Sequence, residues 1–208
     1  MIKENDYHWF PMRIRHASLQ RLQSLLDNLN KEKERLEKEN ILLDAYAPMR
    51  FIKVNMSKMD FAPYLLNYIF VRSTFTDIVS LKSNKQLFEP LRFVMHPAYD
   101  EKYNPNKEVV VIPDKRMEDY RRVTQSERDD IIFLRDPQYA AKPSQAVQII
   151  EGDFAGVIGK IKRVRGKRCV VLTISDMQAA AIVDVHQNHL RFLTEVEIHD
   201  YGLEAVHI

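Results

Sequence analysis

The stretch VQIIEGDFAGVIGKI, residues 147–161, decides how the second half of this chain folds. It contains three of the five glycines, and no glycine precedes Gly152. All nine prolines, by contrast, lie between Pro11 and Pro143. Glycine permits tight turns and close approach of two backbones, whereas proline interrupts hydrogen-bonded strands. The partition therefore predicts two domains, 1–128 and 144–208, joined by a linker at 129–143.

The second domain is expected to contain strands only. Apolar residues alternate or cluster in five short segments, at residues 147–149, 159–164, 169–174, 179–185 and 189–193. About 50 residues of closely spaced strands and turns are typical of a small SH3-like β-barrel. By alternation we expect Ile161, Val164 and Val170 to point inward.

The first domain alternates strands with helices. Strands are predicted at residues 8–15, 46–54, 67–73, 92–96 and 108–112, with helices at 19–39, at 76–82 and after Pro113. Ser18 and Asp114 are placed to cap the first and last helix. This order predicts a ferredoxin-like α/β sandwich with helices on one sheet face, and an α+β chain overall. In the linker, the apolar residues 131–134 could form a short strand.

Composition excludes several classes of protein. The chain has 208 residues, 45% of them hydrophobic, and a net charge of +2, so it cannot coat nucleic acid by charge alone. Its apolar runs fall far short of the ~20 residues of a membrane span, and no secretory signal is visible at the N-terminus. Cys169 is the single cysteine. We therefore expect a cytoplasmic protein without disulfides and without a membrane partner.

Two local patterns resemble one known family. Residues 147–161, with Gly152, Phe154, Gly156 and Gly159, resemble a KOW motif, in which Gly159 would allow either a backbone kink or close packing that a Cβ would obstruct. KOW motifs occur in NusG-type transcription factors and in some ribosomal proteins.

The second pattern lies in the first domain. HWF at 8–10, NYIFV at 67–71 and VIPD at 111–114 resemble the NusG N-terminal (NGN) domain, so that the likeness extends over residues 7–195. The sequence LLN at 65–67, where a housekeeping NusG has Pro-Gly, is more similar to the specialised RfaH and UpxY branch. That branch implies antitermination in a long operon, such as one for surface polysaccharide, rather than termination with Rho.

The resemblance assigns partners to two groups of residues. Alternation places Trp9, Tyr68 and Phe70 opposite the helix-covered face, and an exposed aromatic cluster suits a partner's helix. The resemblance makes that partner the β′ clamp helices of RNA polymerase, with Leu65 joining the cluster. The alternative is that these aromatic residues pack under the second domain or an extra strand. The segment Val79, Ser80, Leu81 and Lys82 aligns with the one that meets the polymerase β gate loop.

Two groups of cations are candidate nucleic-acid contacts. Arg13, Arg15, His16 and Arg21 lie at the end of the first strand and the start of the first helix, a region that faces non-template DNA in RfaH-like proteins. A hairpin around Gly166 holds six cations in nine residues, and suits RNA phosphates or an acidic protein: Lys160, Lys162, Arg163, Arg165, Lys167 and Arg168. The resemblance implies a ribosomal protein or Rho as the protein partner. Ordinary solvated surface charge is the alternative for both groups.

No constellation indicates catalysis. His186 and His189 with Cys169 do not match a zinc pattern, so neither a metal nor a cofactor is expected. Three classes remain open: an elongation factor that binds RNA polymerase, an RNA-binding or ribosome-associated KOW protein, and an enzyme built on a ferredoxin-like domain. A housekeeping NusG is a variant of the first class.

Overall fold

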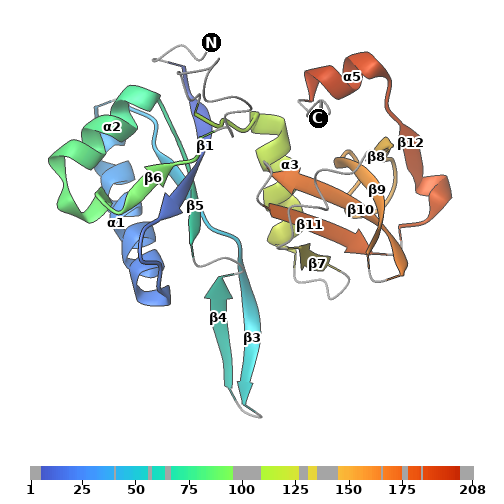
Figure 1. Cartoon of the computed structure of the whole chain (residues 1–208), viewed down its shortest axis with the longest axis horizontal. Coiled ribbons are helices and arrows are strands. Elements are labelled where there is room, and N and C mark those ends of the chain that lie inside the picture. Colours follow the sequence, from blue (N-terminus) through green and yellow to red (C-terminus); the bar gives the residue numbers. More distant parts are fainter. Residues whose placement is uncertain are drawn as a thin grey trace, which may run out of the picture. The chain divides into compact units, whose positions relative to one another are not determined.

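The computed structural model describes residues 6–39, 41–55, 58–63, 67–95, 109–126, 131–134, 145–164, 166–174, 178–183 and 185–201. Contacts between residues divide the chain into a first unit, Met1–Ile112, and a second unit, Pro113–Ile208. Both combine helices with antiparallel strands, as the predicted α+β class requires. Figure 1 shows the elements of each unit.

The first unit contains β1 (His8–Ile14), α1 (Leu19–Glu37), β2 (Asp44–Tyr46), β3 (Met49–Asn55), β4 (Lys58–Pro63), β5 (Tyr68–Ser73), α2 (Phe75–Asn84), η1 (Gln86–Phe88) and β6 (Leu91–Phe93). Four of its strands form an antiparallel sheet in the order β2-β5-β1-β6. Strands β3 and β4 pair separately as a hairpin.

One face of this sheet carries the core of the first unit. Phe10 pairs with Val71 and Met12 with Ile69, and all four side chains are buried. Leucines at helical spacing on α1 and residues of α2 pack into the same cluster. The predicted face assignment of β1 and β5 is therefore confirmed, because opposite residues of an antiparallel pair share a face.

Local capping was predicted in part. The Ser18 hydroxyl accepts a hydrogen bond from the Arg21 amide at 3.1 Å, so Ser18 caps α1 as expected. The second unit opens with α3 (Asp114–Thr124), but Pro113 occupies its N-cap and Asp114 is already helical, so the predicted aspartate cap is wrong.

Three strand predictions in the first unit need correction. The predicted strand 46–54 is divided at Pro48 between β2 and β3, because proline interrupts pairing. In the described part of the predicted strand 108–112, residues 109–112 form isolated bridges only, from Val109 to Met95 and from Ile112 to Trp9. Strand β4 was not predicted.

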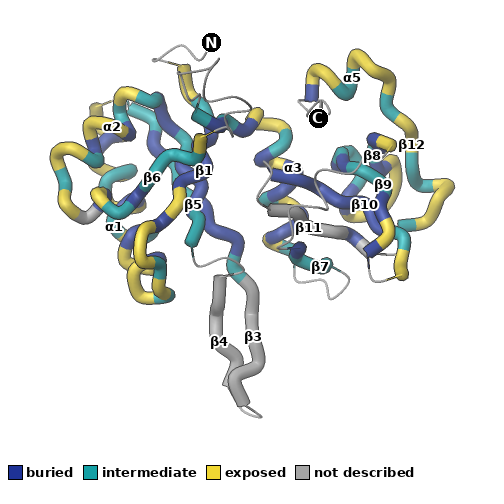
Figure 2. The backbone as a smooth tube through the Cα atoms, in the orientation of Figure 1, coloured by how far each residue is buried: buried dark blue, intermediate teal, exposed yellow. Residues whose placement is uncertain are grey.

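The second unit continues with β7 (Ile131–Leu134), β8 (Ala146–Ile149), β9 (Ile158–Val164), β10 (Lys167–Ile174), β11 (Gln178–Val183), η3 (Gln187–His189), β12 (Leu190–Phe192) and α5 (Glu195–Asp200). The strands form one antiparallel sheet in the order β12-β8-β9-β10-β11-β7. Strand β7 is the short strand foreseen within the predicted linker, and it pairs with β11. In Figure 2 the tube of β10 is dark blue over most of its length, because its side chains are buried from Cys169 onward.

Gly159 is placed where two strands approach closely. A Cβ built on it would lie 2.7 Å from Val170 Cγ1 and 2.8 Å from the Val171 carbonyl oxygen. Its φ is not in the left-handed region, so the requirement is for space rather than for backbone freedom. Of the two roles predicted for this glycine, a backbone kink or close packing, the structure supports close packing.

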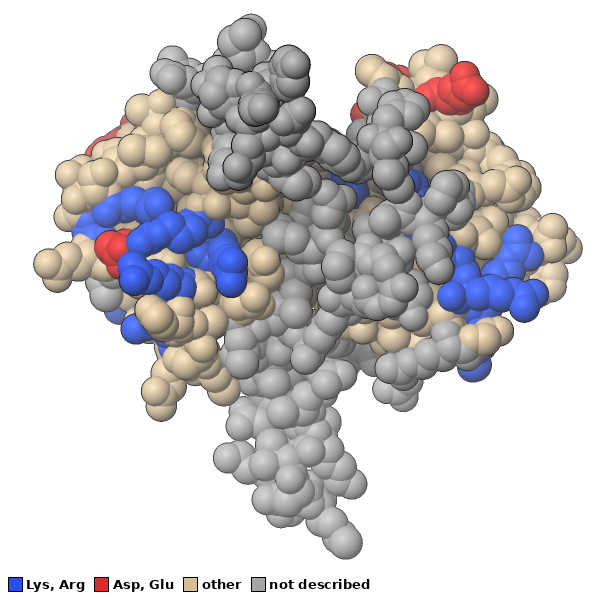
Figure 3. All heavy atoms as spheres, viewed as in Figure 1, with Lys and Arg blue, Asp and Glu red and all other residues tan. Residues whose placement is uncertain are grey.

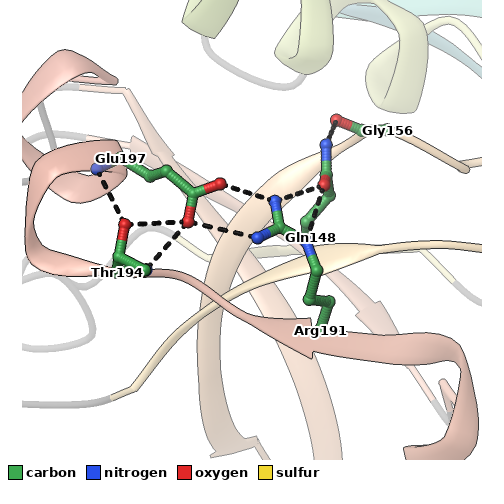
Figure 4. Close-up of polar contacts among 5 residues, drawn as sticks. All are labelled: Gln148, Gly156, Arg191, Thr194 and Glu197. Carbon is green, nitrogen blue, oxygen red and sulfur yellow. Dashed lines mark hydrogen bonds and ion pairs between the residues drawn. The ribbon is translucent and has the colours of Figure 1, made fainter.

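The helix α5 was missed, because the second domain was expected to contain strands only. The Thr194 hydroxyl accepts from the Glu197 amide, and the Glu197 carboxylate accepts from the Thr194 amide, which is a complete capping box. Figure 4 shows how Arg191 joins this box to the sheet, donating to Glu197 at 3.1 Å and to Gln148 at 2.8 Å. The Arg191 hydrogen bond and those from Thr194 lower the pKa of Glu197 to about 2.

Candidate nucleic-acid interface

Two arginines, one at the end of β1 and one in the turn to α1, are exposed to solvent, and a third stabilises this turn. Arg13 and Arg15 are exposed. His16 has a φ of 51°, in the left-handed region that non-glycine residues seldom adopt. The Arg21 guanidinium donates to the carbonyl oxygens of Arg15, at 2.8 Å, and His16, at 2.9 Å. Arg21 therefore positions the turn, a role that its place in the sequence does not reveal.

Strand β6 and helix α2 add two further cations beside these arginines. The β1–β6 register places Arg92 directly opposite Arg13. Lys82, in the last turn of α2, lies with its Nζ 5.4 Å from the centre of the Phe93 ring. Burial, and then the nearby Arg92 charge, lower the pKa of Lys82. Crowding of like charges of this kind creates a positive potential that attracts anions.

One carboxylate lies among these cations. Glu89 accepts a hydrogen bond from Arg92 Nη2 at 2.6 Å, and this bond lowers its pKa. The charges of Arg92, Arg15 and Lys82 lower it further. We name the group the basic surface, and its members are Arg13, Arg15, Arg21, Lys82 and Arg92. Figure 3 shows Lys and Arg atoms gathered over β6, with an acidic spot among them.

Tyr68 lies at the edge of the basic surface. It is the cross-strand partner of Arg13 and, unlike its strand neighbour Phe70, remains partly exposed. Tyr68, Arg13 and Arg92 thus follow one another across β5, β1 and β6 on the same sheet face. An aromatic ring next to guanidinium groups can stack a base while the cations contact phosphates. Sequence reasoning missed Arg92, since only the β1–β6 register brings it to Arg13.

The predicted exposed aromatic cluster is wrong for two of its members. Trp9 and Phe70 lie on the expected face but are only 4% and 1% exposed. Tyr46 of β2 pairs with Phe70 and stacks on it, with ring centroids 6.4 Å apart. A neighbouring strand therefore supplies a ring that stacks on Phe70. Leu65 lies outside the described residues, and polymerase binding by Tyr68 stays a prediction.

The four residues predicted to meet a gate loop do not form one surface. Val79 and Ser80 are exposed on α2 and Lys82 is partly exposed. Leu81, however, is buried in the core of the first unit, because helical periodicity turns it toward the sheet. Leu81 is therefore corrected to a core residue.

The KOW-like turn of the second unit has a defined backbone. Gly156 adopts a φ of 89°, which favours glycine, and its amide donates to the Ile149 carbonyl oxygen at 2.7 Å. Gly152 has a φ of 84°, and Phe154 between them is 6% exposed. The turn is thus closed by backbone hydrogen bonds over a buried aromatic ring.

The six cations of the β9–β10 hairpin are divided between environments, which corrects the prediction of one cationic surface. Lys162 lies opposite Cys169 and is only 9% exposed, since this face packs in a cluster with Leu134. Arg163 lies opposite Arg168, which donates to the Gln187 side chain at 3.0 Å. Lys167 is exposed and Lys160 partly exposed, and Arg165 lies outside the described residues.

Two further observations concern the described residues only. His189 Nε2 lies 3.2 Å from Glu151 Oε2, and the rings of His186 and His189 are 5.5 Å apart, but no group of three potential metal ligands is found there. Among the same residues, no helix has the length and apolar character needed to cross a membrane.

Comparison with models of protein families gives no match for this chain. A search of curated proteins also finds no match.

Proposed function

We propose that this protein is a non-enzymatic transcription factor that binds RNA polymerase and promotes processive transcription of a specific long operon, such as one for surface polysaccharide. The β′ clamp helices are the proposed partner of the first unit, and the non-template DNA is the proposed ligand of the basic surface. By joining two sides of the polymerase clamp, the factor would favour the closed, active enzyme.

The architecture of the first unit supports this proposal. In the sheet, the strands have the order β2-β5-β1-β6. Along the chain, when the β3–β4 hairpin is left out, the elements follow as β1, α1, β2, β5, α2 and β6. This is the βαββαβ order expected of a ferredoxin-like NGN domain. In the second unit, the closed turn at Gly156 and the close approach at Gly159 agree with the proposed KOW barrel.

The single observation that carries the proposal is the basic surface beside Tyr68. Its cations come from β1, α1, α2 and β6, which are separated in sequence, and the fold gathers them at one end of the sheet. Mixed charge on solvated helices does not require this convergence. A DNA strand beside a polymerase-bound factor would supply the anion that such a surface favours.

The deciding experiment is capture of purified RNA polymerase by the full chain, followed by transcription through pause sites. We expect the wild-type chain to bind and to raise the fraction of full-length transcript. Tyr68→Ala should weaken binding, while Tyr7→Ala, which changes an exposed tyrosine of the first unit, should not. A wild-type chain that does not bind polymerase would overturn the proposal.

Trp9 and Phe70 are unsuitable for this test. Both are almost fully buried, so truncation to alanine should cost about 3–5 kcal/mol and lose binding through unfolding. Tyr68 is partly exposed, so its truncation tests contact with the polymerase separately from the stability of the fold.

A second candidate function rests on the pairing of Arg163 with Arg168 across β9 and β10. Like charges placed directly opposite each other are destabilising unless an anion relieves them. An RNA-binding or ribosome-associated role of the second unit follows as the alternative. It predicts association with ribosomes or RNA in the absence of polymerase.

A further inference from the structure

The helix α3 is bound to the sheet of the second unit by a stripe of polar side chains. Arg116, Asp119 and Arg122 are spaced three residues apart and therefore share one side of the helix. Arg116 Nε donates to the Thr173 carbonyl oxygen at 2.6 Å, and Arg122 Nη1 donates to that of Ala155 at 2.7 Å. The stripe thus reaches both the end of β10 and the KOW-like turn.

The centre of this stripe is a buried carboxylate. Asp119 is only 2% exposed. Its Oδ2 accepts from the Tyr201 hydroxyl at 2.6 Å and from the Ile158 amide at 3.2 Å, and its Oδ1 accepts from Lys115 Nζ at 2.5 Å. Burying a carboxylate is costly unless donors surround it, and here the donors come from three elements.

Tyr201 brings the C-terminal helix to this carboxylate. It follows α5 directly, is 6% exposed, and packs in a cluster with Ala146, Leu193 and Ile198. Burial, and then the Asp119 charge, raise the pKa of its phenol, so the hydroxyl remains a donor at neutral pH. A helix of six residues is marginal by itself, so this anchor matters for whether α5 persists.

The path of the chain adds a second observation. The Ile112 amide donates to the Trp9 carbonyl oxygen at 2.9 Å, which ties residue 112 to the first unit. Asp114 already begins α3. Pro113 alone therefore separates the last residue bound to the first sheet from the helix bound to the second.

We propose that Asp119 and Tyr201 form a latch that locks α3, β9 and α5 into one cooperative unit, so that the joint between the two units lies at Pro113 rather than at 129–143. Loss of either partner releases both helices together. A ligand that engages α3 or α5 is thereby coupled to the barrel. This inference does not depend on polymerase binding, so the two proposals fail separately.

Hydrogen exchange of the full chain tests the latch, with Tyr201→Phe as the variant that keeps the ring and removes only the hydroxyl. A hydrogen bond to a charged group is strong enough that its loss should speed exchange in both α3 and α5 about tenfold or more. Exchange in β1 and α1 should stay unchanged. Tyr7→Phe is the matched control, because its hydroxyl accepts from the Leu42 amide within the first unit.

Two outcomes would overturn the proposal. Faster exchange in α5 with α3 unchanged would show that the C-terminal helix frays independently. An equal rise in the exchange rate of α1 would show that α3, β9 and α5 do not form a separate cooperative unit. Asp119→Asn combined with Tyr201→Phe gives a further check, since two partners of one latch should have non-additive effects, and additive effects would also reject it.

Discussion

Of the two basic regions, the β9–β10 hairpin is the more prominent in the sequence, whereas the basic surface is the more prominent in the structure. The β9–β10 hairpin holds the densest run of cations, yet strand alternation divides them and Lys162 is buried. The basic surface comes from isolated cations of separate elements: Arg92 lies opposite Arg13, and the charges of Arg92, Arg15 and Lys82 act on one carboxylate, Glu89. Density along a strand is therefore a poor guide to charge density on a surface, because neighbouring residues point to opposite faces.

The largest effect should come from disturbing the close approach of β9 and β10 at Gly159. Gly159→Ala places a Cβ against the Val171 backbone, which cannot move without shifting β10. We expect a loss of about 1–3 kcal/mol in the free energy of unfolding, measured by denaturant titration. Gly152→Ala, where a Cβ meets nothing within 4 Å but φ is 84°, is the comparison for strain without a clash. A stable Gly159→Ala protein would show that the close approach is not required.

The next effect should be on DNA binding by the basic surface. Removing two exposed charges with Arg13→Gln and Arg15→Gln should lower affinity for single-stranded DNA about tenfold and flatten its salt dependence. The control is Lys31→Gln with Lys38→Gln, which removes the same net charge from exposed positions of α1 and its C-cap. Fluorescence anisotropy at several salt concentrations measures both. Equal losses in the two variants would reduce the basic surface to ordinary net charge.

A smaller effect is expected from the hairpin. Arg163→Gln with Arg168→Gln should weaken RNA binding by about threefold, because only part of the cation run shares that face. Lys160→Gln, which lies on the other face opposite Val171, should have no effect. Filter binding with one RNA compares these variants. A loss caused by Lys160→Gln as large as that of the arginine pair would mean that both faces act together.

The smallest effect should be a gain. The Arg92 hydrogen bond lowers the pKa of Glu89, so this carboxylate stays charged at every pH above its ordinary value. Glu89→Gln should therefore raise DNA affinity about twofold near pH 7 by removing an opposing charge. The difference in DNA affinity between Glu89→Gln and the wild type should shrink once the pH falls below the ordinary carboxyl pKa and the wild-type Glu89 becomes neutral. Unchanged affinity would place the nucleic acid away from Glu89.

The sequence was sufficient to predict structural features that depend on residues close together along the chain. Alternation in β1 and leucine spacing in α1 predicted the first core, and Thr194 with Glu197 carried a capping-box signal for α5 that was overlooked. Contacts between distant segments could not be predicted in this way. Phe70 stacks on Tyr46 of another strand, and the role of Arg92 depends on the register with Arg13.

The domain organisation shows the same limit. Glycine and proline predict a change of backbone character near residue 144, but they carry no information about which sheet a helix packs on. Arg116, Asp119 and Arg122 make hydrogen bonds from α3 to distant strands and turns of the second unit. The predicted boundaries at 128 and 144 stay a prediction beside the division found at Ile112 and Pro113.

The buried position of Cys169 gives the protein a built-in chemical reporter. It is the single cysteine of the chain, it is 1% exposed in the middle of the second sheet, and its thiol points to the Lys167 carbonyl oxygen at 3.6 Å. Alkylating reagents can reach it only when β10 opens. The rate of labelling in native buffer therefore measures that opening directly, without an introduced probe, in any variant that retains this residue.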